Sequence, residues 1–468
     1  MKVSAVAIGL LFILGSQANA EDLLIKVAQP VYTKQAAIYF QSQGLHSEAV
    51  TDQWIRVQGD AKQADLMKFL ESGSILHVQK NVKLRTLKNP GLQTALQKYL
   101  AAHPEQATAP FAAPDARDNP AIPVAPTQGT GADPLFSKQW GMNDIGLQNA
   151  LRINPGSNNI IVAVIDTGVD YTHEDLVANM WRNPKEIPDN QIDDDHNGFV
   201  DDIVGWDFLD NDNKPFDLAA KDLGELLNGG NPGHGTHCSG NVAARGDNGI
   251  GTSGVAPHAQ IMALRFIGHD GTTANAIKAI HYAVDNGAKV LSNSWGSDGE
   301  DPADAADNQA LRDSIKYAAD HNVLFVAAAG NSSMNNDTSE KRGYPASYDN
   351  DNIISVAAVD SANNLASFSD YGATSVDIAA PGVKVFSTTV GSQYSDSVIP
   401  LLGANWDGTS MACPHVAGAA ALYWSAHPEK TYAQVKQAIM ASAVVLPSLQ
   451  GKVVTNGKLN VEKLMQQP

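Results

Sequence analysis

From residue 160 onward, short runs rich in β-branched residues alternate with stretches of helical character, which limits the chain to few folds. Buried strands are expected at residues 160–165, 261–264, 289–293, 323–328, 353–358 and 376–379. Such alternation predicts an α/β fold, with a mostly parallel sheet and helices on both faces. Ligands of these sheets bind at the carboxyl ends of the strands. We therefore expect the functional side chains just after these runs.

The first 20 residues have the pattern of a signal peptide. Lys2 precedes an apolar run over residues 3–14, and Ala18-Asn19-Ala20 has the small-x-small form of a signal-peptidase site. The run is shorter than the roughly 20 residues that span a bilayer, so a membrane anchor is disfavoured. We expect cleavage after Ala20 and export to the extracellular space or the periplasm, without membrane association.

A small α+β unit follows over residues 21–100. Strand and helix patterns succeed one another at residues 23–28, 33–43, 50–57, 62–72 and 75–87. Residues 101–131 are crowded with Ala and Pro and have no apolar periodicity, so we interpret them as an extended linker. The larger domain then occupies residues 132–468.

The charge is distributed unevenly along the chain, whose net charge is −18. Residues 1–130 hold 12 basic and 10 acidic side chains, and residues 131–468 hold 20 basic and 40 acidic ones. A domain with this excess of carboxylates is not expected to bind nucleic acid or an anionic membrane, and it favours cations. The 2 cysteines exclude a disulfide-rich framework.

Three short motifs carry residue types that work together in acyl transfer. Asp166 closes the first buried run, His234 opens an expected helix in Gly-His-Gly-Thr-His, and Ser410 lies in Gly-Thr-Ser-Met-Ala just before a helix of small residues. Taken singly, each has a structural explanation: a turn after a strand, a packed histidine, and a helix cap. The order Asp, His, Ser along one chain favours catalysis.

With the segments Ser294-Trp295-Gly296, 327–331, 343–346 and 380–382, these motifs make the chain resemble the subtilisin-like serine peptidases from about residue 132 to its end. The resemblance implies a subtilisin-like α/β fold. It also implies that residues 21–100 are an inhibitory propeptide, which resembles the family's propeptides in size, element order and position.

The chemistry of acyl transfer assigns a role to each residue. His234 would take the proton of the Ser410 hydroxyl, and Asp166 would orient the imidazole and stabilise its charged form. The helix that follows Ser410 directs backbone N–H groups at the oxyanion. Asn331 would supply the second oxyanion donor from its side-chain amide; in subtilisin, loss of that donor lowers kcat by about 10² to 10³.

The family resemblance places a peptide-binding groove between two segments. They are Ser294, Trp295 and Gly296 on one edge, and Ala328, Ala329 and Gly330 on the other. Pairing with the main chain of a substrate gives affinity with little sequence preference. Gly343 stands at the expected pocket floor and leaves room for a large group, so we expect broad specificity with a preference for large apolar residues before the scissile bond, and no strict dibasic requirement.

An acidic loop between Asp166 and His234 has the oxygen ligands that Ca²⁺ prefers. Its candidate ligands are Asp193, Asp195, Asn197, Phe199, Asp201 and Asp202, with a turn at Gly198. Val204 replaces the twelfth-position Glu of an EF-hand, so the loop matches only half of that motif. The alternative is a solvated acidic loop.

A second calcium site is implied by the family resemblance. Its candidate ligands are Asp175, Asn248, the carbonyls of Ile250 and Thr252, and Gln139. The loop over residues 245–252 is one residue longer than the family pattern.

Cys238 and Cys413 lie four and three residues after His234 and Ser410, which places both beneath the expected active site. A disulfide is one alternative in an exported protein; we favour free buried thiols. His237 with His234 and Cys238 superficially resembles a zinc cluster, but residues this close on one helix supply too few ligands, and we expect His237 to be structural.

Together these features predict an exported, calcium-stabilised serine endopeptidase that is expected to be a monomer. It would act on protein and peptide substrates and remove its own propeptide, an intramolecular inhibitor. Two alternatives are a catalytically silent relative that only binds peptides and a calcium-binding interaction module.

Overall fold

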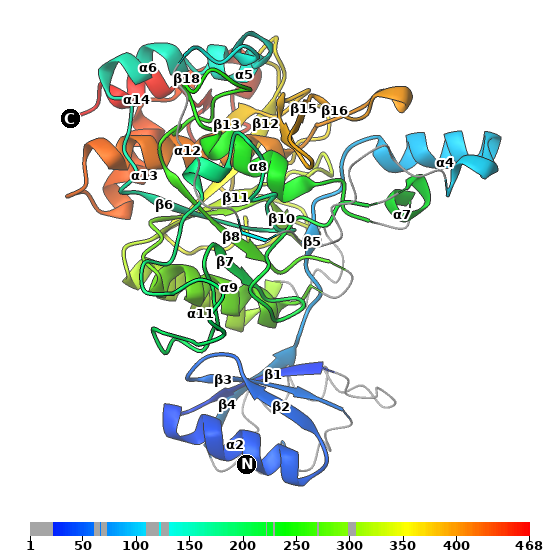
Figure 1. Cartoon of the computed structure of the whole chain (residues 1–468), viewed down its shortest axis with the longest axis vertical. Helices are drawn as coiled ribbons and strands as arrows, with labels where there is room; N and C mark the ends of the chain where they lie inside the picture. Colours follow the sequence, from blue (N-terminus) through cyan, green and yellow to red (C-terminus); the bar gives the residue numbers. More distant parts are fainter. Residues whose placement is uncertain are drawn as a thin grey trace.

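The structure is a computed structural model that describes residues 22–59, 66, 73–108, 121–122, 131–220, 222–227, 230–268, 271–297 and 306–468. The predicted signal peptide, nearly all of the predicted helix over 62–72 and most of the linker lie outside these residues. Figure 1 shows a large body with a small one at one end, joined by a chain segment that crosses the large body.

Within the described residues, nine strands form one sheet in the order β18-β19-β13-β12-β11-β9-β6-β8-β7. Neighbouring strands are parallel except β18 and β19. The strands are β6 (Ile161–Asp166), β7 (Gly205–Asp207), β8 (Gln260–Arg265), β9 (Val290–Asn293), β11 (Leu324–Ala328), β12 (Ile353–Val359), β13 (Ile378–Pro381), β18 (Val444–Val445) and β19 (Gly457–Lys458). The six predicted strands correspond to β6, β8, β9, β11, β12 and β13, so the predicted sheet is confirmed.

Helices cover both faces of the sheet, as predicted (Figure 1). Successive residues of β6 alternate between two apolar cores, with Val162 and Val164 in one and Ala163 and Ile165 in the other. Helices α8 (His234–Ala243) and α12 (Thr409–Ala426) bury the first core, and α9 (Thr273–Asp285) and α11 (Gln309–Asp320) bury the second. A strand buried on both faces explains the continuous apolar runs of the sequence.

Shorter elements surround this sheet. The helices are α5 (Trp140–Asp144), α6 (Leu147–Ile153), α7 (Leu223–Leu227), α13 (Tyr432–Ala441) and α14 (Val461–Met465), with 3-10 turns at Pro104–Gln106, Phe136–Lys138, Val177–Asn179, Pro400–Leu402 (η5) and Pro447–Leu449. The strands are β10 (Trp295–Gly296), β14 (Ser387–Thr389), β15 (Gln393–Ser395), β16 (Ser397–Ile399) and β17 (Ala404–Asn405). None of the described helices is both long and apolar enough to cross a membrane.

The small body is an antiparallel sheet in the order β2-β3-β1-β4 with one described helix of more than one turn, α2. Its elements are β1 (Asp22–Val27), α2 (Pro30–Ser42), β2 (His46–Ala49), β3 (Trp54–Gln58) and β4 (Ile75–Lys80). The α+β character agrees with the prediction. The last predicted strand, 75–87, was wrong in its extent: β4 ends at Lys80, and a separate strand β5 (Arg85–Thr86) leaves the small sheet to pair with β10.

A helix that the sequence analysis did not predict follows β5. It is α4 (Leu92–Ala102), and it occupies the start of the predicted linker as well as the end of the α+β unit. Its buried residues Leu92, Leu96 and Leu100 recur every four positions. This spacing places them on one face of a helix, which packs against α7 of the large domain.

The small body lies against α9 and α11 on the large domain. Lys26 Nζ lies 2.6 Å from Asp313 Oδ2, and Lys278 Nζ lies 2.6 Å from Glu48 Oε2. The Gln79 side chain accepts a hydrogen bond from the Ala310 N–H at the start of α11. The described leader, residues 22–108, therefore contacts the large domain at the small body, at β5 and at α4.

Candidate active site

Strand β6 and helix α8 bring two of the predicted catalytic residues together. Asp166 is the last residue of β6, His234 is the first of α8, and His234 Nδ1 lies 2.8 Å from Asp166 Oδ1. Gly235 permits this approach, because a Cβ there would lie 2.1 Å from the Gly168 carbonyl oxygen. The Gly235 N–H donates to the Thr167 hydroxyl, so the two sequence motifs also bind each other.

A buried carboxylate that the sequence analysis missed holds these motifs in register. Asp217 accepts hydrogen bonds from the Thr167 hydroxyl, from the Thr236 N–H and hydroxyl, and from the Asn231 side chain. Burial raises the pKa of Asp217 to about 6. Its position in the sequence gives no signal of this role, because only the fold brings it to both motifs.

The surroundings of His234 favour its protonated form. Burial is the largest single influence and lowers the pKa of His234, but Asp166 and Cys238 together outweigh it, so the pKa lies well above its ordinary value of 6.5. The other ring nitrogen, Nε2, is buried and has no hydrogen-bond partner among the described residues. The imidazole is thus fixed at one nitrogen and open at the other.

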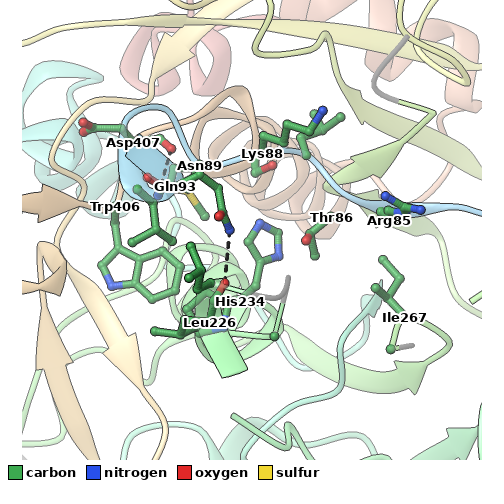
Figure 2. Close-up of a pocket in the computed structure, with 18 residues that line it drawn as sticks. Arg85, Thr86, Lys88, Asn89, Gln93, Leu226, His234, Ile267, Trp406 and Asp407 are labelled. Atoms are coloured by element: carbon green, nitrogen blue, oxygen red, sulfur yellow. Dashed lines mark hydrogen bonds between the residues drawn. The ribbon is translucent and has the colours of Figure 1, made fainter. Parts of the chain in front are cut away.

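Ser410 is the second residue of α12, so it lies inside the first turn of the helix rather than just before the helix, where we predicted it. Its hydroxyl donates to the Ser294 carbonyl at 3.1 Å. Both Ser410 and His234 line the same cavity, of about 410 Å³, which is viewed in Figure 2. The serine therefore faces the cleft of the histidine, with its hydroxyl turned toward β10.

A proline shapes the backbone around Ser410. Pro414 lacks the N–H that would bond to the Ser410 carbonyl in a regular helix. The Ser294 hydroxyl instead donates to that carbonyl at 2.9 Å, and the Cys238 thiol donates to it at 3.5 Å. The first turn of α12 is therefore fixed from outside the helix.

The side chain of Asn331 is oriented by the start of the same helix. Its Oδ1 accepts from the Thr409 N–H at 2.8 Å and from the Thr409 hydroxyl at 2.9 Å. Its Nδ2 donates to the carbonyl of Lys88 at 2.9 Å. The amide that we predicted to be an oxyanion donor thus holds a peptide carbonyl of the leader.

The leader runs through the cleft as an added strand. Thr86 pairs with Trp295 and Arg85 with Gly296 in antiparallel register. Leu87 is buried, and its side chain lies near Gly296, where a Cβ would be 3.4 Å from it. Figure 2 shows residues 85–89 bordering the cavity beside His234.

The two predicted edges of the peptide-binding groove differ in which of their groups can contact a substrate. Trp295 contributes only its backbone, because its side chain is fully buried in a core with Phe266 and Phe325. Ala328 ends β11, and Ala329 and Gly330 follow it. Gly343 lies against this edge, since a Cβ there would be 2.9 Å from the Ala329 carbonyl oxygen.

Both cysteines are free and buried, as we favoured. Burial raises the pKa of the Cys238 and Cys413 thiols, so both are neutral near pH 7. His237 Nε2 donates to the Val385 carbonyl at 3.0 Å, and the ring stacks on Trp406 at 4.2 Å, so its environment is structural.

The acidic loop gathers carboxylates, including one that the sequence analysis missed. Glu186, Asp193 and Asp195 each present an oxygen within 4.8 Å of the others. Glu186 lies outside the alternating spacing of the loop, so that pattern did not include it. Lys185 is 3.8 Å from Asp195.

The other predicted ligands of this loop have different partners. Asp201 accepts from the N–H groups of residues 190 and 191, and Asp202 accepts from Tyr282, Asn183 and Asn197. The ring of Phe199 packs on Tyr282, which leaves only its backbone as a ligand. The carboxylate cluster is therefore centred on Glu186, Asp193 and Asp195.

The predicted second site is a buried carboxylate surrounded by donors. Asp175 accepts from the Asn248 amide at 2.9 Å and from the Thr252 N–H at 2.8 Å, and burial raises its pKa to about 7. The Ile250 N–H donates to Asn248, whose amide nitrogen therefore faces Asp175. Gln139 bonds to Ser253 on both sides of its amide. Asn248 and Thr252 therefore converge on Asp175 and satisfy its carboxylate, whereas the Gln139 side chain binds Ser253 instead.

Comparison with known proteins gives concordant results. A family model described as the subtilase family matches residues 157–464. The chain is 38% identical over 323 residues to a thermophilic serine proteinase of Bacillus sp. (strain AK1), covering 66% of this chain and 65% of that protein. It is 35% identical over 340 residues to thermitase of Thermoactinomyces vulgaris, covering 72% of this chain and 99% of that protein.

A solved structure supports the fold. The chain resembles fervidolysin from Fervidobacterium pennivorans, described as a keratinolytic enzyme related to subtilisin, with a TM-score of 0.65 and 23% identity. The match covers 97% of this chain and 62% of fervidolysin. The chain thus spans somewhat less than two thirds of fervidolysin and of the Bacillus proteinase.

Proposed function

Because this chain belongs to the subtilase family, we propose that it is a serine endopeptidase that uses Asp166, His234 and Ser410 as its catalytic triad. The observation that carries the proposal is the buried hydrogen bond of 2.8 Å between Asp166 and His234, in the cleft that Ser410 also lines. A histidine fixed at Nδ1 and open at Nε2 is suited to accept a proton from a serine.

In the proposed reaction, the Ser410 hydroxyl leaves the Ser294 carbonyl and attacks the peptide carbonyl, and its proton passes to His234 Nε2. Asp166 stabilises the imidazolium, which then gives the proton to the leaving amine. The acyl-enzyme is hydrolysed by the same steps with water as the nucleophile. The Asn331 amide and the backbone N–H groups at the start of α12 stabilise the oxyanion.

Substrates would bind as Arg85 and Thr86 do, by antiparallel pairing with β10. Pairing of this kind uses main-chain atoms, which supports broad specificity. The Lys88 carbonyl held by Asn331 makes Lys88 the residue before the scissile bond, and the burial of Leu87 beside Gly296 supports an apolar residue one position earlier. A preference for large apolar residues directly before the scissile bond stays a prediction.

The leader would be a temporary inhibitor that the enzyme removes itself. Its segment over 85–89 lines the cleft, and the Lys88 carbonyl takes the hydrogen bond that we assign to the oxyanion. A first cut beside Lys88 would free the small body from the larger domain. The pattern of residues 1–20 supports export, and we propose that the mature enzyme is a secreted monomer.

Calcium would stabilise the large domain at one or two sites. Glu186, Asp193 and Asp195 supply only oxygen ligands. Backbone N–H groups and Lys185 at 3.8 Å offset part of their mutual repulsion, and three carboxylates this close together suit a hard cation. The Asp175 site fits less well, because the Asn248 amide must turn its oxygen toward the ion. A bound ion would lower the charge repulsion of the loop without taking part in catalysis.

Labelling by a fluorophosphonate tests the activity. A serine peptidase should form one stable adduct on Ser410 and lose all hydrolysis of a chromogenic peptide. A silent relative or a calcium-binding module would form no adduct and hydrolyse nothing, and an adduct on another serine would contradict the assignment.

A further inference from the structure

An apolar surface beside the cleft is covered by the leader in this structure. Leu223 and Leu226 of α7 form it with Ile399 and Ala404 of the β16–β17 region, and we refer to these four residues as the leucine surface. The three buried leucines of α4 pack on it. Figure 1 shows α4 and α7 side by side, away from the small body.

The contact between α4 and this surface includes directional hydrogen bonds. The Gln93 amide donates to the Leu226 carbonyl at 3.1 Å, and the Gly224 N–H donates to the Ala107 carbonyl at 2.9 Å. Upstream of the helix, the Asn89 amide donates to the Asn405 carbonyl at 2.9 Å. The surface therefore holds a chain from residue 89 to residue 107.

The leucine surface is continuous with the catalytic cleft. Leu92, Gln93 and Leu226 line the same cavity as His234 and Ser410 (Figure 2). The carbonyl held by Asn331 belongs to Lys88, and α4 begins four residues later. A substrate that follows the path of the leader passes over the leucine surface on the C-terminal side of its scissile bond.

Removal of the leader would leave this surface without its present cover. Leu223 and Leu226 are 7% and 3% exposed beneath α4, and Leu401, in the same β16–β17 region, is 72% exposed. An apolar patch that borders a cleft marks a binding surface. The present occupant, α4, shows which chemistry fits this surface. It is an amphipathic helix with leucines at every fourth position. It carries Lys98 and no acidic side chain, which suits a domain rich in carboxylates.

We propose that the leucine surface is a docking site for substrates that carry such a helix after the scissile bond, and that α4 occupies this site until the leader is removed. The inference rests on the proposed peptidase function and names a substrate class for it. Such docking would make the enzyme prefer substrates that carry an apolar helix away from the scissile bond, whereas main-chain pairing with β10 discriminates little between sequences.

A pair of peptides tests this inference. The substrate is a fluorogenic peptide of residues 84–107, and its matched control carries Leu92→Ala, Leu96→Ala and Leu100→Ala, which keep helix propensity and remove the apolar face. With the enzyme that the full chain produces by its own processing, kcat/KM for the substrate should exceed that for the control at least about tenfold, mostly through KM. Equal values would overturn the proposal.

Two enzyme variants locate the effect. Leu223→Ala should bring the ratio of the two kcat/KM values close to one, whereas Val445→Ala, an exposed apolar residue on β18 at the other edge of the sheet, should leave the ratio unchanged. A ratio that survives Leu223→Ala would place the preference elsewhere. A dimer of the processed enzyme that Leu223→Ala dissociates would make a second copy the occupant and overturn the proposal.

A binding measurement distinguishes failure of the docking site from failure of the proposed peptidase function. A labelled peptide of residues 89–107 should bind the full chain only after processing, and the triple alanine peptide should bind at least about tenfold more weakly. If neither fluorogenic peptide is hydrolysed, the peptidase function fails. If both are hydrolysed and the labelled peptide binds no better than its control, only the docking site fails.

Discussion

The catalytic groups and the leader that covers them are held by different kinds of contact. Asp166, His234 and Asn331 are each fixed by side-chain hydrogen bonds of 2.8 to 2.9 Å. The leader is held by backbone pairing at β10, by ion pairs at α9 and α11 and by the apolar face of α4. Single substitutions should therefore have large effects on catalysis and small effects on leader binding.

The strongest test of this contrast on the catalytic side is Asp166→Asn. It should lower kcat by about 10⁴, because the neutral amide no longer holds the reactive tautomer of His234.

The pH profile of the wild type is a second test on the catalytic side. His234 must be neutral to accept a proton, and Asp166 raises the pKa of His234. The value of kcat/KM should therefore rise with pH through an inflection above 6.5. The pH profile of kcat/KM measures this, and an inflection at or below 6.5 would contradict the assigned electrostatics.

Asn331→Leu should lower kcat by about 10² to 10³ with little change in KM, because it removes a donor to the oxyanion and keeps the side-chain volume. Thr409→Val is the matched control. It removes the hydroxyl bonded to Asn331 but retains the amide donor, so its effect should be smaller. Equal losses in both variants would mean that Asn331 acts only through the packing of α12.

Calcium affects the scaffold that carries the catalytic groups. Chelation by EGTA should lower the melting temperature of the wild type by about 5 °C, because an ion bound only to the folded state stabilises it. Glu186→Gln should abolish most of this shift, and Asp175→Asn should abolish less of it. An unchanged melting temperature under chelation would count against both sites.

The smallest effect is expected on the leader side. The ion pair of Lys26 and Asp313 is partly exposed, so Lys26→Ala in a leader peptide of residues 21–100 should weaken its inhibition of the processed enzyme only about threefold. Lys34→Ala, an exposed lysine on α2, is the control and should have no effect. A loss of inhibition greater than about 30-fold would show that leader binding is concentrated at one residue.

The sequence predicted the parts of the fold that depend on local patterns. The strands were visible as buried apolar runs, and Asp166, His234 and Ser410 stood in short motifs at their ends or at helix starts. The free thiols Cys238 and Cys413 were also expected. In each case the signal lies within a few residues of the feature.

Features that depend on contacts between distant segments were not predicted. Asp217 and Glu186 lie outside the motifs that they join, and only the fold brings them there. The sequence analysis assigned part of α4 to the linker, because the apolar face of this helix is buried only by its contact with α7. Trp295 was placed in the groove, but its side chain fills the core behind β10.

The central claim is that Ser410 is the nucleophile that also releases the leader, and maturation of the full chain tests it most directly. Expressed without other proteases, the wild type should be cut beside Lys88 and at later positions, and Ser410→Ala should remain a single chain that begins at Glu21. Mass spectrometry of both proteins gives the answer. Normal processing of Ser410→Ala would contradict the account, because another group would then have to cut the leader.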